Sequence, residues 1–148
     1  MDRLTLAAAA TIVDTALAKG RETGCAPLTV AVLDAGGHLV ALKREDGSGI
    51  MRADIAFAKA WGALGLGVPS RVLADLAEKM PQNMQTFAVI SGGRLFAAPG
   101  GVLIRNEEGG ILGAVGVSGD VSDKDEVCAV HGVSEARLVP DTQSRSVY

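Results

Sequence analysis

Residues 28–43 read LTVAVLDAGGHLVALK, two apolar runs separated by a pair of glycines. The first run, residues 28–34, is rich in β-branched side chains, and residues 38–43 resume the pattern after Gly36-Gly37. Runs of this kind around two glycines are typical of a β-hairpin. A turn this short makes the strands antiparallel, because parallel neighbours need a long crossover connection. The sequence therefore predicts an antiparallel sheet that contains this hairpin.

Helices are expected on both sides of the hairpin. Residues 6–22 place apolar side chains at helical spacing, with Thr5 as N-cap and Gly24 as the stop. After the polar loop REDGSG, residues 51–66 show small or apolar side chains at the same spacing, and Ser70 is suited to cap a short helix that runs to residue 79. The first half of the chain thus predicts a helix, two strands and two further helices.

In the second half of the chain the apolar residues no longer recur at helical spacing, and the sequence favours strands. Residues 87–90 and 95–98 flank a turn at residues 91–94, and two more apolar runs follow at residues 102–105 and 111–117. A helix is expected from Ser122 to about residue 137. The connections between these strands are too short for crossover helices. The predicted class is α+β in the order α-β-β-α-α-β-β-β-α, with helices packed on an antiparallel sheet.

Length and composition indicate one ordered domain. The chain has 148 residues, 48% of them hydrophobic and 21% charged, which excludes a disordered protein. We expect a single domain over residues 1–137, followed by a polar C-terminal tail at residues 138–148. The two cysteines, Cys25 and Cys128, form no metal-binding or redox motif and are expected to pack as small apolar side chains.

Charge and hydropathy exclude several classes of partner. The net charge is −3 without a basic cluster, and the chain has only 3 Phe, 1 Trp and 1 Tyr, so we expect no nucleic acid partner. No stretch approaches the ~20 apolar residues of a membrane span, so no membrane partner is expected. The first residues lack the basic segment and cleavage pattern of a signal peptide, which predicts a cytoplasmic protein.

Four segments, in this order and at these spacings, resemble the haem-binding GlcG/HbpS family. They are VLDAGGHLVALKREDG (32–47), RADIAFAKAWGA (52–63), APGGVLI (98–104) and GGILGAVGVSGDVSDKDE (109–126). The resemblance runs from about residue 4 to 133 and extends to the C-terminal domain of PduO-type cobalamin adenosyltransferases. It implies a profilin-like fold with a five-stranded antiparallel sheet and flanking helices, assembly into a homo-oligomer, and a ligand pocket near the PGG loop and the GVSG turn.

Two glycine-lined bends are the candidate ligand-binding elements. Glycine leaves the backbone N–H accessible, so Gly100 and Gly101, together with Ser118 and Gly119, are suited to bind a carboxylate, a propionate or an oxyanion. We predict that the two bends converge on a common anion-binding hollow beside the sheet. The alternative is that these glycines only permit tight turns.

Three side chains are the candidates for chemistry. His38 is a candidate general base or axial ligand of haem iron, with a solvent-facing side chain as the alternative. Arg52 and Lys59 are seven residues apart on one helical face, where they would bind a dianionic ligand or the haem propionates, unless they form surface ion pairs. The lysine of A-x-A-K-A recurs in the family motif, so the resemblance favours Lys59. No metal site is expected from the spacing of histidines and cysteines.

Three functions remain open at this point. The resemblance favours a small-ligand-binding protein that takes haem or another tetrapyrrole. The residues also suit a cofactor-independent lyase or isomerase acting on a small carboxylate or aromatic catabolite, with His38 as base, Ser118-Gly119 amides as oxyanion donors and Lys59 or Arg52 holding a carboxylate. A non-catalytic ligand-sensing module is the third possibility. All three predict an anionic small-molecule ligand.

Overall fold

The computed structural model describes residues 1–143. In this part of the chain the helices are α1 (Leu6–Glu22), α2 (Arg52–Leu66), α3 (Ser70–Lys79), α4 (Pro81–Ile90) and α5 (Ser122–Glu135). The strands are β1 (Thr29–Asp34), β2 (Leu39–Arg44), β3 (Gly101–Arg105), β4 (Ile111–Ser118) and β5 (Val139–Asp141). None of these helices is both long enough and apolar enough to cross a membrane.

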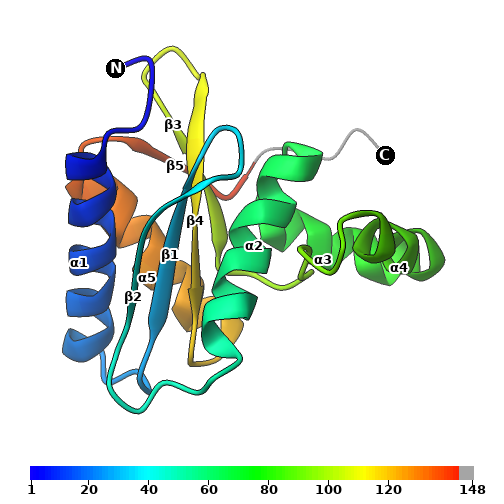
Figure 1. Ribbon diagram of the computed structural model, residues 1–148, viewed down its shortest axis with the longest axis horizontal. Helices are drawn as coiled ribbons and strands as arrows, with labels where there is room; N and C mark the ends of the chain where they lie inside the picture. The colour runs from blue at the N-terminus through cyan, green and yellow to red at the C-terminus, as the bar shows by residue number, and fades with distance from the viewer. Residues whose placement is uncertain (144–148) are drawn as a thin grey trace.

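The strands form one open sheet in the order β2-β1-β4-β3-β5, in which every neighbouring pair is antiparallel. Helices α1 and α5 cover one face of the sheet, and α2 covers the other (Figure 1). This arrangement confirms the α+β class and the five-stranded antiparallel sheet with flanking helices. The predicted hairpin is also confirmed as β1 and β2, which are joined by a turn that contains Gly36 and Gly37.

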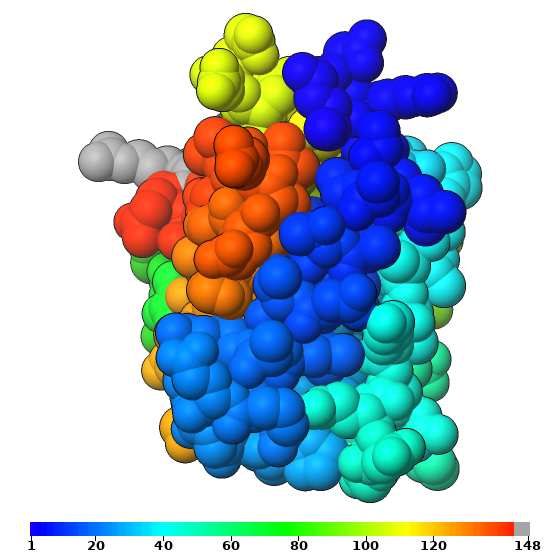
Figure 2. All heavy atoms as spheres, turned by 90° about the vertical axis from the view of Figure 1, so that its left-hand side faces the viewer, coloured from blue at the N-terminus to red at the C-terminus, as the bar shows by residue number. Residues whose placement is uncertain are grey.

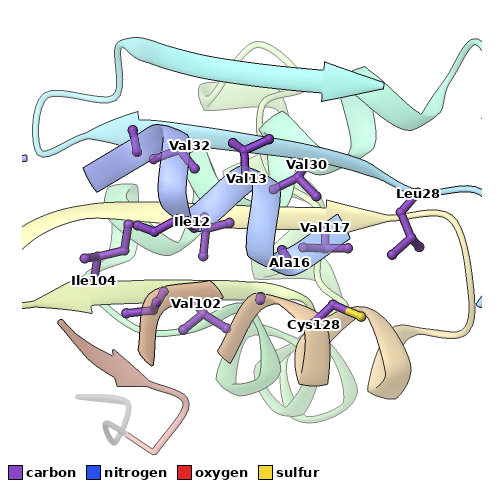
Figure 3. Close-up of a cluster of buried hydrophobic side chains, with 14 of the residues drawn as sticks. Ile12, Val13, Ala16, Leu28, Val30, Val32, Val102, Ile104, Val117 and Cys128 are labelled. Carbon is purple, nitrogen blue, oxygen red and sulfur yellow. The ribbon is translucent and has the colours of Figure 1, made fainter. Parts of the chain in front are cut away.

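The larger part of the core lies between the sheet and the two helices α1 and α5. Ile12 and Ala16 from α1 meet Val30, Val117 and other inward-facing strand residues in this layer (Figure 3). The two helices lie side by side on this face of the molecule (Figure 2). They approach closely because Gly132 on α5 has no side chain: a Cβ there would lie 2.6 Å from the carbonyl oxygen of Ile12.

Helix α2 packs on the opposite face through small side chains. Ala56, Ala60 and Ala63 are fully buried along one stripe of the helix. At Gly116 of β4 the missing side chain lets the helix backbone rest on the strand, because a Cβ there would overlap the carbonyl oxygen of Ala56. Gly116 therefore marks the close approach of another backbone, a common role of glycine inside a strand.

The prediction of strands at residues 87–90 and 95–98 is wrong. Residues 81–90 form helix α4, which starts with Pro81 at a position that suits proline, and residues 95–98 belong to no strand. Helices α3 and α4 project to one side of the sheet (Figure 1). The last strand of the sheet comes instead from the start of the predicted tail, as β5, and residues 144–148 of that tail lie outside the described residues.

Candidate functional site

The two glycine-lined bends lie side by side at one end of the sheet. Gly101, the first residue of β3, is paired with Gly116 of β4, and the N–H of Val117 donates to the carbonyl oxygen of Gly100 at 3.0 Å. The connection that contains Ser118 and Gly119 follows directly. The two bends are therefore neighbours in the structure, as the sequence analysis expected.

The space between the bends is filled by Lys59 of α2. Only 2% of its side chain is exposed, and its Nζ donates to the carbonyl oxygen of Val117 at 2.9 Å. A Cβ at Gly100 would lie 2.8 Å from this Nζ, so Gly100 has to be small to admit the lysine. The open anion-binding hollow predicted from the sequence is thus occupied by a side chain of the protein.

The amide of Gly101 also has a partner within the chain. Its N–H donates to Oγ of Ser70 at 2.7 Å, and Ser70 is fully buried. Ser70 was predicted to cap α3, but it is the first residue of that helix, and Pro69 holds the N-cap position without a side-chain hydrogen bond. The hydroxyl therefore joins α3 to the start of β3.

Lys59 forms a buried ion pair with Asp125 of α5. The two charged groups lie 3.1 Å apart, and Oδ1 of Asp125 also accepts the N–H of Asp120 at 3.0 Å. Burial lowers the pKa of Lys59 and raises the pKa of Asp125, because each charge has lost its hydration, and the opposite charge of the partner counteracts both shifts. The pair fastens α2 to α5 at the end of β4.

Arg52 and Ser118 meet at the same end of the sheet. Nη1 of Arg52 donates to Oγ of Ser118 at 3.1 Å; Ser118 is fully buried and Arg52 is half-buried. Gly119 adopts a φ of 151°, and a Cβ there would overlap the carbonyl oxygen of Pro27. Gly119 is therefore required by the packing of the chain itself.

Arg71 belongs to this region, although the sequence analysis did not select it. Its guanidinium donates to both carboxylate oxygens of Glu126, at 3.1 and 3.0 Å, and to Asp123 at 2.6 Å. The side chain reaches from α3 to the first turn of α5. The available signal was the pair of acidic residues three apart at a helix start, which present both carboxylates on one face.

His38 lies at the opposite end of the sheet. Thr29 of β1 pairs with Ser118, whereas Asp34, at the far end of the same strand, pairs with Gly113, so the two ends are roughly 17 Å apart along the strand. The β1–β2 turn is near the top of the sheet in Figure 1 and the β4–α5 connection is at the bottom. The structure therefore does not bring His38 together with Lys59, or with the Ser118-Gly119 amides, around one small substrate.

The imidazole of His38 is oriented by Asp34. Oδ1 of Asp34 accepts hydrogen bonds from the N–H groups of Gly36 and His38, both at 3.0 Å, and lies 3.1 Å from Nδ1 of the ring. The backbone N–H of His38 holds the pKa of Asp34 below its ordinary value, so this carboxylate is ionised at neutral pH. An ionised carboxylate only accepts, so Nδ1 carries the proton, and the lone pair of the neutral ring is on Nε2.

The glycines of the turn make room for two rings. A Cβ at Gly36 would lie 2.8 Å from Cε1 of His38, and a Cβ at Gly37 would lie 2.9 Å from Nε1 of Trp61. Gly37 also has a φ of 83°, in the left-handed region. The guanidinium of Arg94 stacks 4.0 Å above the Trp61 ring. The Gly-Gly pair thus forms the turn and at the same time leaves space for the side chains on its two sides.

His38 borders a cavity of about 540 Å³ between the N-terminal segment and the β1–β2 turn. This volume falls within the range of small-molecule sites. Four aliphatic side chains line it, and Arg3 adds a cation. The complete lining is Asp2, Arg3, Leu4, Thr5, Leu6, Asp34, Ala35, Gly36, His38, Ile111 and Leu112. Within residues 1–143, no group of three or more His, Cys, Asp or Glu side chains is arranged to bind a metal ion.

Several solved structures are similar to this chain over most of its length. A crystal structure of the protein ORFY from Klebsiella pneumoniae has a TM-score of 0.83 and 25% identity, covering 93% of this chain and 92% of that one. A double mutant of HbpS from Streptomyces reticuli has a TM-score of 0.77 and 27% identity, covering 90% of this chain and 87% of that one.

A complex of PduOC with haem shares the fold, with a TM-score of 0.82 at 18% identity, covering 92% of this chain and 96% of that one. No curated protein matches the chain significantly. The model of the family described as haem degrading protein HbpS-like matches residues 4–134. Because that match spans nearly the whole domain, the chain belongs to the HbpS-like family.

Proposed function

We propose that the chain is a small-ligand-binding protein that takes haem or a related tetrapyrrole in the cavity at His38. One observation carries the proposal. The ionised carboxylate of Asp34 fixes the proton of His38 on Nδ1, and Nε2 has no hydrogen-bond partner among the described residues. A histidine whose second nitrogen is bonded to a carboxylate is the usual arrangement around a metal-ligating imidazole.

The cavity suits haem in three respects. His38 offers an imidazole nitrogen, a frequent axial ligand of haem iron. Leu4, Leu6, Ile111 and Leu112 give it aliphatic walls, as the macrocycle requires. Arg3 lies in the same lining and would pair with a propionate.

Each of these residues has a defined role in the proposal. His38 would hold the iron, Asp34 would orient the ring, and the aliphatic side chains would exclude water from one face of the macrocycle. Bound haem supplies an iron centre whose reactivity depends on its axial ligand and on access to the metal. The family and the haem complex of a protein with the same fold support this ligand class.

Arg52 marks a second candidate location for an anionic ligand. It is half-buried beside Ser118, and its neighbours Ile50 and Met51 are exposed by 92% and 66%, an unusual degree for large apolar side chains. A carboxylate-bearing apolar ligand would find a cation and apolar contacts there. Lys59 is less suited to touch it, because its ammonium is already bonded to Asp125 and to Val117.

A haem titration followed by absorbance in the Soret region tests the proposal and separates the two locations. The wild type should give a saturable spectral change at micromolar protein. His38→Ala should lose the spectrum of the ligated iron, and Asp34→Asn should weaken binding by about tenfold or more. Arg52→Ala, at the other end of the sheet, is the matched control and should titrate like the wild type.

Two outcomes would overturn the proposal. The absence of any saturable change with the wild type would exclude haem as the ligand. A His38→Ala variant that titrates like the wild type, together with a loss of binding in Arg52→Ala, would place the ligand at Arg52 instead.

A further inference from the structure

Cys25 and Cys128 meet inside the protein, although they are far apart in the sequence. Cys25 lies in the connection between α1 and β1 and is 4% exposed, and Cys128 lies on α5 and is fully buried. Both belong to the hydrophobic cluster under α1 and α5, where Figure 3 shows Cys128 with its sulfur in yellow. The two thiols are free, and after burial the proximity of Cys25 is the next cause that raises the pKa of Cys128.

Both cysteines are neighbours of Gly20 on α1. The N–H of Cys25 donates to the carbonyl oxygen of Gly20 at 2.9 Å, so the chain folds back over this residue after α1 ends. On the other side, a Cβ at Gly20 would lie 3.8 Å from Sγ of Cys128. Both cysteines therefore lie beside Gly20, near the C-terminal end of α1.

We infer that Cys25 and Cys128 form a modification site, which closes into an intramolecular disulfide when the protein meets a low-molecular-weight disulfide such as oxidised glutathione. The thiolate of one cysteine attacks a glutathione sulfur, forms a mixed disulfide and releases one glutathione thiolate. The second cysteine loses its proton and attacks the protein sulfur of the mixed disulfide, releasing the second glutathione. Two protein thiols are oxidised and one glutathione disulfide is reduced.

Cys25 is the cysteine that reacts first. Its neighbours Gly24 and Ala26 are exposed, so a small opening of this connection brings its sulfur to solvent, whereas Cys128 sits on a packed helix. Burial raises the pKa of the Cys128 thiol to about 12, which leaves almost no thiolate at neutral pH. The reaction is therefore slow at neutral pH and faster in alkaline solution.

Polar contacts keep the connection between α1 and β1 closed and limit its opening. Arg21 donates to the carbonyl oxygens of Cys25 and Ala26, at 2.7 and 2.9 Å, and the N–H of Ala26 donates to Asp120 at 2.7 Å. Removal of the Arg21 guanidinium should accelerate oxidation without moving either cysteine. The cysteines lie near the C-terminal end of α1, whereas the cavity at His38 lies at its N-terminal end, so the disulfide should not alter ligand binding.

The disulfide is tested on the full chain with oxidised glutathione as the oxidant. The folded protein should lose about 2 Da, for two hydrogen atoms, and both titratable thiols. Peptide mapping should recover a linked peptide that contains Cys25 and Cys128. The unfolding temperature should rise on the order of 10 °C, because the bond closes a long loop, and dithiothreitol should reverse the rise. Arg21→Ala should oxidise several-fold faster than the wild type.

Cys25→Ser and Cys128→Ala are the matched controls and should show no rise in unfolding temperature with the oxidant. Cys25→Ser should retain a free thiol at Cys128, whereas Cys128→Ala should stop at the mixed disulfide with glutathione. Three results would overturn the inference: disulfide-linked dimers as the main product, a stable glutathione adduct of the wild type, or two thiols that stay reduced in the folded wild type while unfolded protein is fully oxidised under the same conditions.

Discussion

Lys59 and Asp125 place an ammonium and a carboxylate 3.1 Å apart in the protein interior, with 2% and 1% of their side chains exposed. The pair lies where α2, α5 and the end of β4 meet, and Lys59 also donates to the backbone of β4. Two charges without water must neutralise each other, because an unpaired ion in this position has nothing to replace its hydration. The pair therefore links these three elements, and neither charge can be removed alone without leaving the other unpaired.

Lys59→Met should lower the free energy of unfolding by about 3–5 kcal/mol, because Asp125 is left as an uncompensated buried charge. Urea unfolding followed by circular dichroism measures the change. The double variant Lys59→Met with Asp125→Leu should recover part of the loss, since it removes both charges.

Lys19→Met is the matched control for this prediction. Lys19 pairs with Glu22 on the surface of α1, and a pair of that kind contributes about 0–1 kcal/mol. Equal losses from Lys59→Met and Lys19→Met would show that the buried pair adds nothing beyond an exposed one.

Periodicity predicted most of the fold and failed at one helix. The hairpin follows from two β-branched runs around the Gly-Gly turn, α1 and α2 follow from the helical spacing of apolar side chains, and α3 and α5 follow from helix-start signals. Helix α4 lacks a regular apolar face: Met84 is its only buried residue, and Val89 and Ile90 are exposed by 79% and 75%. These β-branched residues favour a strand locally, but the segment packs on α3 as a helix. Tertiary contacts overrode the local preference.

The candidate site differs from the expectation at Lys59, which forms a buried ion pair with Asp125. The structure brings the two bends, Arg52 and Ser118 to the same end of the sheet. The sequence analysis expected Lys59 to contact a ligand. The neighbouring Ala56, Ala60 and Ala63, however, place Lys59 on the buried stripe of α2. The buried stripe can be recognised from the sequence. Asp125, the partner of Lys59, lies on a helix far along the chain, so only the folded structure brings the two charges together.

Gly116→Ala should cost about 3 kcal/mol of stability, because the new methyl group would overlap the carbonyl oxygen of Ala56 and neither backbone can move freely. Gly67→Ala is the control. Gly67 has a φ of 72° with open space around it, so only backbone strain of about 1 kcal/mol is expected there. Denaturant unfolding compares the two variants. Similar costs would mean that α2 does not rest on β4 as closely as described.

Asp34 should make the stability of the β1–β2 turn depend on pH. Its folded-state pKa lies below its unfolded-state pKa, chiefly because the N–H of His38 donates to it. The stabilisation is therefore complete above the unfolded-state pKa and is lost as the pH falls through the folded-state value. In thermal unfolding between about pH 6 and pH 2, Asp34→Asn should show a flatter acid limb than the wild type. Parallel acid limbs would contradict this assignment.

Copies of the chain should assemble in solution, as the resemblance and the small-residue composition predict. The described surface exposes several large apolar side chains, including Val89, Ile90 and Val121. Exposed apolar side chains such as the adjacent Val89 and Ile90 at the end of α4 favour association, because a second copy can cover them. Light scattering coupled to size exclusion should give a multiple of 15.1 kDa. A single species at 15.1 kDa over micromolar concentrations would refute assembly.

Gly36→Ala should separate ligand binding from stability. A Cβ at this position would lie 2.8 Å from Cε1 of His38, which is the end of a movable side chain, and the backbone of Gly36 is not in the left-handed region. The fold should therefore lose less than about 1 kcal/mol, while the ring is displaced from its contact with Asp34. Haem binding should weaken by about tenfold, as for other losses of the group that orients a ligating histidine.

Gly49→Ala provides the comparison for Gly36→Ala. Its new methyl group would meet only Cγ of Arg52, at 3.8 Å, and its backbone also tolerates a side chain. Both variants should unfold within about 1 kcal/mol of the wild type. Only Gly36→Ala should shift the haem titration, because only it moves the imidazole. If both variants bind haem like the wild type, the orientation of His38 by Asp34 has no part in holding the ligand.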